Sequence, residues 1–193
     1  MEKMTFAVCT TSEGMATTAI AREYKVVIDA DTEMGGKGMG PNPMETALSA
    51  LAGCENITAR IIAQEMEFDL QGIDFEMSAA LDPQGIMGNP DIRTYFEKVE
   101  AKAVLKTTES DDRIQALKRA VEQRCPMYGM VKAANVEMIS RWVKAYTKEK
   151  HTWFICKLLS RLPMPTGLSP RVFIKSTRRR FSIASPVQNP KNC

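Results

Sequence analysis

The sequence predicts an α+β fold, with elements in the order βββ, α, ββ, αα, β along residues 1–146. Three observations predict it. Short β-favouring runs fill the N-terminal segment, a long helical pattern with complete start signals follows, and two later segments alternate strictly between apolar and polar side chains before the helical period returns. This order differs from the regular strand–helix repeat of a parallel Rossmann-type sheet.

The N-terminal strands are expected at 5–10, 16–20 and 23–30, because these segments are short and rich in β-favouring side chains. Ser12-Glu13-Gly14 is typical of a hairpin turn, so we expect three antiparallel strands. The loop GGKGMGPNP follows. Its GxGxG spacing lacks the flanking strand and helix of a phosphate-binding motif, so we interpret it as a flexible loop.

A helix is predicted from Pro43 to about Met66. Asn42 is the expected N-cap, and Glu45, three residues later, is interpreted first as its capping-box partner. Small and apolar side chains then recur at steps of three and four residues: Ala47, Ala50, Leu51, Cys54, Ile57, Thr58 and Ile61. Because Cys54 belongs to this stripe, its thiol is expected to face inward or toward a partner.

Two strands are predicted next, over 73–81 and 99–105. Apolar side chains alternate in both, which gives each strand one buried face. Turns are expected between them at Asp82-Pro83-Gln84-Gly85 and at Gly88-Asn89-Pro90.

A second helix is expected to start near Ser110 and to break at Cys125, because a residue before proline is pushed out of the helical region. Pro126 then begins a further helix that runs to Ala134, and a last strand covers 136–145. As the N-cap of that helix, Cys125 would hold its sulfur near free backbone N–H groups, which favour a thiolate.

The cysteines do not indicate a metal site. The five cysteines form no CxxC pair, and the single histidine, His151, is distant in sequence from any cysteine cluster. Structural zinc is therefore excluded as an interpretation, and we expect neither a metal nor a bound cofactor.

The charge pattern places a boundary near Tyr146. From Thr147 onward the chain has ten Lys or Arg and one acidic residue, a net charge of +9, which leaves residues 1–146 with 16 basic and 22 acidic side chains, a net of −6. We expect a separate extension at 147–193 that is basic, contains Pro and Ser, and is compatible with disorder. A membrane-surface helix near Trp153 and a nucleic-acid contact at Arg178-Arg179-Arg180 are weaker interpretations.

No apolar run approaches the roughly 20 residues that cross a bilayer. The start MEKMTFAVCTT also lacks the apolar core of a secretory signal. We expect a cytoplasmic protein with no membrane span and no nucleic-acid partner.

The segments GPNPMETALSALAGC and, about seventy residues later, RCPMYGMV resemble the OsmC and Ohr proteins. The resemblance covers about residues 3–146, and the element order agrees with it. It implies an OsmC-like fold in which antiparallel sheets pack on two long central helices within an intertwined homodimer.

The same resemblance implies a thiol-dependent peroxidase that reduces small organic hydroperoxides in oxidative stress defence. Cys54 would be the peroxidatic residue, which becomes a sulfenic acid, and Cys125 the resolving residue, which forms a disulfide with it. An external dithiol reductant, lipoyl-type or other, would restore both thiols.

The chain departs from the family pattern around Cys54. Met44 follows the helix-start proline where the established peroxidases have a glutamate, and Glu45 lies one residue later, about 100° further round the helix. The N-terminal arginine that meets this glutamate is also missing from its expected place, with Arg22 the nearest candidate. Two hypotheses therefore remain: the enzyme, which the cysteine pair favours, and a non-catalytic dimer that binds a small hydrophobic ligand or senses redox state.

Overall fold

The computed structural model describes residues 3–145, which lie in the first of two units, Met1–Tyr146. The predicted extension at 147–193 lies outside the described residues. The described strands are β1 (Cys9–Glu13), β2 (Ala16–Ala21), β3 (Tyr24–Ile28), β4 (Gly72–Ala80), β5 (Lys98–Lys106) and β6 (Glu137–Lys144). The described helices are the 3₁₀ helix η1 (Thr32–Met34) and the α-helices α1 (Pro43–Glu65), α2 (Pro83–Ile86), α3 (Asp111–Arg124) and α4 (Pro126–Ala133).

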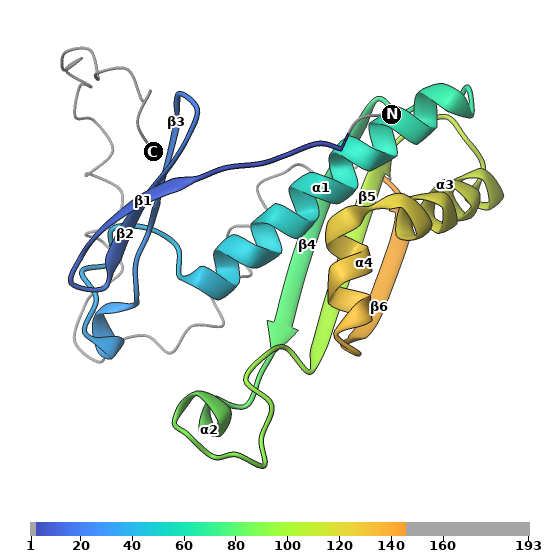
Figure 1. Ribbon diagram of the computed structural model, residues 1–193. Coiled ribbons are helices and arrows are strands. Elements are labelled where there is room, and N and C mark those ends of the chain that lie inside the picture. Colours follow the sequence, from blue (N-terminus) through green and yellow to red (C-terminus); the bar gives the residue numbers. More distant parts are fainter. Residues whose placement is uncertain (1–2, 146–193) are drawn as a thin grey trace, which may run out of the picture. The chain divides into compact units, whose positions relative to one another are not determined.

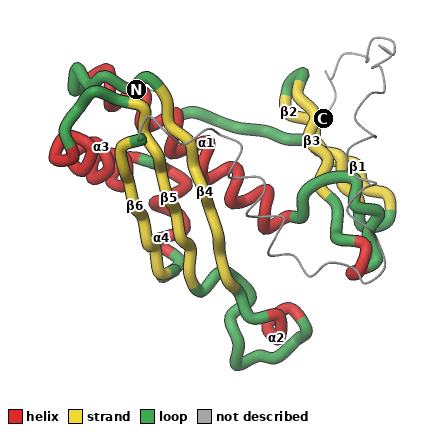
Figure 2. Tube along the Cα trace, turned by 180° about the vertical axis from the view of Figure 1, so that it is seen from behind, coloured by secondary structure: helices red, strands yellow, loops and turns green. Residues whose placement is uncertain are grey.

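The predicted α+β class and element order are confirmed, with two short additions: η1 forms after β3, and α2 forms where turns were expected. The helices α1, α3 and α4 lie on one face of the sheet β4–β5–β6, which is seen from its other face in Figure 2 (Figures 1 and 2). Helix α1 packs on β4 and α3 packs on β6. This part of the chain is therefore a two-layer arrangement of helices on a sheet.

The alternation predicted for β4 and β5 is confirmed. In β5, Val99, Ala101, Ala103 and Leu105 are buried, and the charged residues between them point to the open face. The rings of Phe75 on β4 and Trp142 on β6, the two strands that flank β5, pack edge to face with centroids 6.0 Å apart. Apolar residues from the sheet and from all three helices form one continuous core.

The sheet β4–β5–β6 contains both antiparallel and parallel strand pairs, whereas only antiparallel sheets were expected. Strands β4 and β5 pair antiparallel, whereas β5 and β6 pair parallel. A parallel pair needs a long crossover connection, and α3 and α4 supply it on one face of the sheet. The junction between these helices thereby lies against α1.

The N-terminal strands pair antiparallel in the order β1–β2–β3, as predicted. The first strand is shifted, because β1 extends to Glu13 and the hairpin turns at Gly14-Met15 rather than at 12–14. Gly14 has a φ of 62°, a conformation that glycine adopts without steric cost. The requirement for positive φ therefore sets the turn at the glycine.

The glycine-rich loop is fixed by the buried Asp29. Its carboxylate accepts hydrogen bonds from the backbone N–H groups of Ala30, Lys37 and Met39 at 2.8, 3.0 and 3.1 Å. These bonds hold the pKa of Asp29 below its usual value. A Cβ on Gly36 would lie 1.9 Å from the carbonyl oxygen of Ala30, so close backbone packing requires glycine there. These contacts hold residues 36–39 against Asp29 and Ala30.

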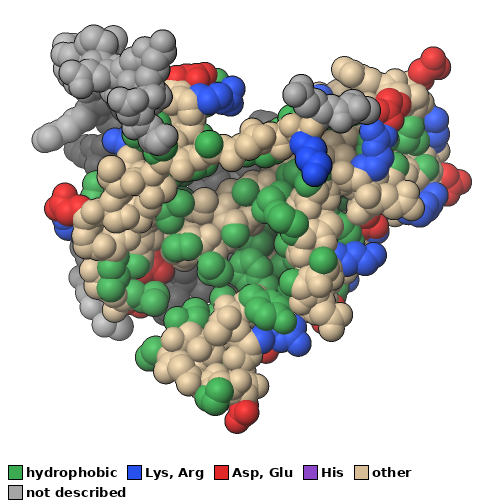
Figure 3. Space-filling model, in the orientation of Figure 1, with side chains coloured by type: hydrophobic (Ala, Val, Ile, Leu, Met, Phe, Trp, Pro, Cys, Tyr) green, Lys and Arg blue, Asp and Glu red, His purple; other side chains and the backbone are tan. Residues whose placement is uncertain are grey.

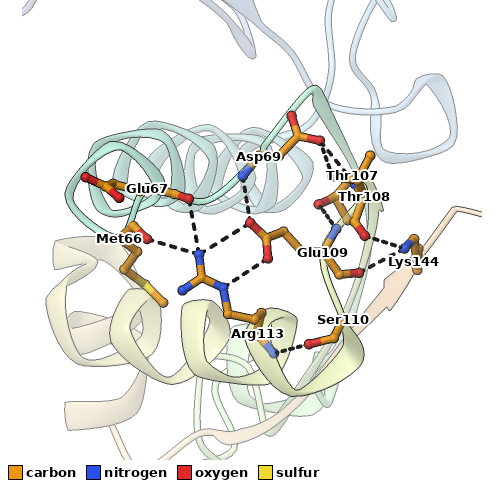
Figure 4. A network of polar contacts seen from close by, with 9 residues as sticks. All are labelled: Met66, Glu67, Asp69, Thr107, Thr108, Glu109, Ser110, Arg113 and Lys144. Atoms are coloured by element: carbon orange, nitrogen blue, oxygen red, sulfur yellow. Dashed lines mark hydrogen bonds and ion pairs between the residues drawn. The ribbon is translucent and has the colours of Figure 1, made fainter.

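The C-terminal end of α1 is held by Arg113 of α3. Figure 4 shows the guanidinium donating to the carbonyl oxygens of Met66 and Glu67, at 3.0 and 3.2 Å, while it pairs with Glu109. Glu109 in turn accepts a hydrogen bond from the backbone N–H of Asp69 at 3.1 Å. The network satisfies carbonyl groups that every helix leaves free at its end, and it fixes α1 against α3.

Within residues 3–145, no helix has the length and apolar character needed to cross a membrane. The same part of the chain contains no cluster of side chains suited to hold a metal ion.

Candidate active site

Helix α1 begins as the sequence predicts. The Asn42 side chain accepts hydrogen bonds from the backbone N–H groups of Met44 and Glu45 at 3.0 and 2.9 Å, and the Glu45 carboxylate accepts one from the Asn42 N–H at 2.9 Å. This complete capping box starts a helix of 23 residues. Cys54 lies near its midpoint and is half-buried at the edge of the core.

The buried stripe of α1 differs from the predicted one. It consists of Leu51, Glu55, Ala59, Ile62 and Ala63, which face the core at helical spacing. Ile57 and Ile61, predicted to face inward or toward a partner together with Cys54, are 62% and 49% exposed in the single chain. The helix is apolar on two sides, so the apolar pattern could not distinguish the side that faces its own core from the side left open.

Cys125 is the hinge between α3 and α4, as predicted. Its N–H donates to the carbonyl oxygen of Val121 at 2.8 Å, and its own carbonyl oxygen accepts from the Gly129 N–H at 2.9 Å. Its φ and ψ of −73° and 117° are extended, as expected for a residue before proline. The side chain is 2% exposed.

An ion pair beside Cys125 ties this hinge to α1. The guanidinium of Arg124 binds both carboxylate oxygens of Glu65, one of them at 2.9 Å. The pair holds the pKa of Glu65 below its usual value through the hydrogen bonds from Arg124. Two-point pairing restricts how the end of α3, and with it Cys125, lies against α1.

The structure places the two thiols near each other. Cys54 packs against the core cluster that contains Cys125 and raises the pKa of Cys125, and neither cysteine is in a disulfide. The N–H of Tyr128, in the first turn of α4, points at the Cys125 sulfur and favours its thiolate.

The expectation that Cys125 favours a thiolate is nevertheless wrong. Burial outweighs the helix N-terminus and, with smaller contributions from Cys54 and Glu55, raises the pKa of Cys125 to about 11. Cys125 is therefore a neutral thiol at neutral pH.

Glu55 is a residue at this site that the sequence reasoning missed. It is 1% exposed, and neither carboxylate oxygen accepts a hydrogen bond from any residue in the described part of the chain. Burial, together with the negative charge of Glu122, raises the pKa of Glu55 to about 7, while Lys118 opposes this rise. One signal could have found it: Glu55 stands four residues from both Leu51 and Ala59, on the stripe that becomes buried.

The two proposed supporting residues lie elsewhere. Glu45 is exposed and holds the capping box, and nine residues of helix separate it from Cys54 by about 14 Å along the axis. Arg22 is exposed in the turn between β2 and β3, with a φ of 57°, and its guanidinium lies 5.0 Å from the centre of the Tyr24 ring. Within one chain, Glu45 is too distant to touch the Cys54 sulfur.

A cavity of about 420 Å³ lies apart from the cysteines in sequence, within the N-terminal strands and the loop after them. It is lined by Thr11, Ser12, Glu13, Ala16, Thr18, Val27, Lys37 and Met39. Lys37 and Glu13 form an exposed ion pair at 3.3 Å on its rim.

Several solved structures have the same fold. The OsmC-like protein from Mycoplasma pneumoniae has a TM-score of 0.66 at 18% identity, with 76% of this chain and 100% of that chain covered. An organic hydroperoxide resistance protein from Elizabethkingia anophelis gives 0.59 at 13% identity, with 75% and 100% covered. The organic hydroperoxide resistance protein OsmC from Legionella pneumophila gives 0.55 at 16% identity, with 75% and 100% covered.

Comparison with curated proteins gives no match. The family model described as OsmC-like protein, in contrast, matches residues 35–139, which is more than half of the chain. This matched range contains α1, the α3–α4 junction and both thiols of the site. The chain belongs to the OsmC-like protein family.

Proposed function

We propose that this protein is a thiol-dependent peroxidase that reduces organic hydroperoxides, with Cys54 as the peroxidatic and Cys125 as the resolving residue. The observation that carries the proposal is the closeness of the two thiols, one half-buried and the other inside the core. Structural relatives named as organic hydroperoxide resistance proteins support the substrate class.

The first step uses the more accessible sulfur. The Cys54 thiolate attacks the terminal peroxide oxygen, the O–O bond breaks, and the departing alkoxide takes a proton and leaves as an alcohol. Cys54 is thereby oxidised to a sulfenic acid.

The second step joins the two sulfurs. The Cys125 sulfur displaces hydroxide from the Cys54 sulfenic acid, water leaves, and a disulfide forms. An external dithiol, lipoyl-type or other, then reduces this disulfide and is itself oxidised to a disulfide. No bound cofactor takes part, and we place the reaction in cytoplasmic defence against oxidative stress.

The exposed side of α1 supports an apolar substrate and a homodimer. Ile57 and Ile61 lie three and seven residues after Cys54, so the three side chains share one side of the helix. Figure 3 shows hydrophobic side chains gathered on the face of the molecule on which α1 and α4 lie. A second copy of the chain that covers this face would enclose Cys54 in an apolar site.

The test is peroxide-dependent loss of thiols with cumene hydroperoxide and hydrogen peroxide, for the wild type, Cys54→Ser and Cys125→Ser. We expect the wild type to consume two thiols per peroxide, Cys54→Ser to be inert, and Cys125→Ser to accumulate a sulfenic acid that dimedone traps at Cys54. A Cys54 that reacts no faster than a free thiol at the same pH would exclude the peroxidase.

A non-catalytic dimer is the second candidate. Two observations favour it: Met44 stands where the established peroxidases have a glutamate, and the Arg22 guanidinium lies over Tyr24. This candidate predicts saturable binding of a small hydrophobic ligand without consumption of thiols in the same assay.

A further inference from the structure

A buried acidic side chain beside the two thiols has no part in the steps described above. Glu55 follows Cys54 directly in α1 and is 1% exposed, with both oxygens unpaired among residues 3–145. Buried carboxyl groups are normally hydrogen-bonded or ion-paired, because an unpaired charge in the core is costly. A group left in this state beside reactive sulfurs is a candidate for proton transfer.

The charged groups around Glu55 come from the two helices that cross α1. On α3, Lys118 and Glu122 form an ion pair with 2.9 Å between nitrogen and oxygen. At the start of α4 lie Cys125 and Tyr128, both of which feel the charge of Glu55. The strand packed on α1, β4, contributes only apolar inward side chains: Ile73, Phe75, Met77 and Ala79.

These neighbours are engaged with each other and leave Glu55 available. Lys118 pairs with Glu122, and the charge of Glu122 raises the pKa of Tyr128. Glu55 therefore differs from Glu122: Glu122 has an ion-pair partner, whereas neither buried oxygen of Glu55 has a hydrogen-bond partner in the described part of the chain.

We propose that Glu55 is the proton acceptor for Cys125 when Cys125 attacks the oxidised Cys54, an inference that rests on the proposed function. The proton passes from the Cys125 sulfur to the Glu55 carboxylate, directly or through one water molecule. The Cys125 sulfur forms the S–S bond with Cys54 as hydroxide departs from the sulfenic acid. Protonated Glu55 then returns the proton to this hydroxide, which leaves as water, so that Glu55 is again a carboxylate and the total charge of the site is unchanged.

The buried state of Cys125 makes such an acceptor necessary. Burial keeps this thiol protonated at neutral pH, with a pKa of about 11, whereas a disulfide forms through the thiolate. A carboxyl group with a pKa of about 7 is populated in both forms near neutral pH, so it serves as acceptor and then as donor.

The role can be tested without peroxide. In the full chain carrying Cys9→Ser, Cys156→Ser and Cys193→Ser, Ellman's reagent places a thionitrobenzoate on Cys54. Cys125 then displaces this group, and the release of coloured thionitrobenzoate reports how fast Cys125 loses its proton and attacks. The rate is followed from about pH 6 to about pH 9, a range that spans the ionisation of Glu55.

With Glu55 intact, we expect the rate to rise with an inflection near the pKa of Glu55, about 7. Glu55→Gln should lower the rate near neutral pH by roughly a hundredfold and abolish this inflection, so that the rate rises only as the thiol itself ionises. Glu122→Gln is the matched control, because it removes a neighbouring carboxyl group that is already paired with Lys118. It should keep an inflection, moved to lower pH because the charge of Glu122 raises the pKa of Glu55.

Disulfide formation by Glu55→Gln at the wild-type rate and with the wild-type pH profile would overturn the proposal. Loss of the inflection in Glu122→Gln instead would also overturn it. Glu55→Met provides a second variant of similar volume if the glutamine variant does not fold. Because the assay needs no peroxide, a wild type that is inert toward cumene hydroperoxide would exclude the peroxidase without deciding the role of Glu55.

Discussion

Replacing Glu55 with glutamine is expected to remove a pH dependence from the stability of the fold. Burial raises the pKa of Glu55 from 4.5 to about 7. Between these values the unfolded chain has released the proton and the folded chain still holds it. The contribution of the neutral carboxyl group is therefore fully present below about pH 4.5 and is lost as the pH rises through about 7.

The size of the effect follows from the same two pKa values. Each unit by which the pKa of Glu55 differs between the folded and unfolded states corresponds to about 1.4 kcal/mol. The ionised carboxylate therefore costs the fold about 3 kcal/mol above neutral pH. This is a large share of the roughly 5–15 kcal/mol that stabilises a typical domain. Glutamine has the same shape and cannot ionise, so the variant should not lose this stability.

The assay is urea unfolding of the reduced protein, followed by circular dichroism at about pH 5 and about pH 8. The measured quantity is the change in unfolding free energy between the two pH values, compared between wild type and variant. The exposed Glu76 on β4 supplies the control, and Glu76→Gln should behave as the wild type does. Equal pH dependence in the wild type and in Glu55→Gln would refute the burial argument.

Three further predictions concern other parts of the fold. Arg113→Ala should lower the unfolding free energy by about 1–3 kcal/mol, because the carbonyl groups at the end of α1 lose their donor. Urea titration at neutral pH measures this change, and unchanged stability would contradict the role of the network. Asn42→Ala should cost about 1 kcal/mol through loss of the N-cap, and the same titration measures it, with an unaltered midpoint as the contrary result. Ile57→Asp should convert the proposed dimer to monomers in light scattering, since Ile57 is 62% exposed in the single chain; a wild type that is already monomeric, or a variant that stays dimeric, would count against the dimer.

Local signals made the helix boundaries predictable. The start of α1 depends on Asn42, Pro43 and Glu45, and the α3–α4 break depends on the Cys125-Pro126 pair; both are interactions between residues adjacent in sequence. The parallel pairing of β6 with β5 was not predictable in the same way. Strand direction depends on how a crossover connection packs, and no residue pattern within β6 records it.

In the candidate site, too, local sequence predicted some features and not others. Both cysteines were identified from their segments, but the charge environment was not. Burial determines the protonation of Cys125 and Glu55, and burial arises from the crossing of α1, α3 and α4. The sequence analysis did not single out Glu55, which faces the core. Its burial follows only from the packing of the three helices.

The hydrogen bonds that hold Cys125 from both sides have a consequence for how the protein would cycle. The residue ends one helix and starts the next, with its N–H and its carbonyl oxygen both engaged. A disulfide would bring the two sulfurs to about 2 Å from each other. These backbone hydrogen bonds would oppose unwinding of α3 or α4 as the sulfurs approach, so repeated turnover would leave both helix ends in place.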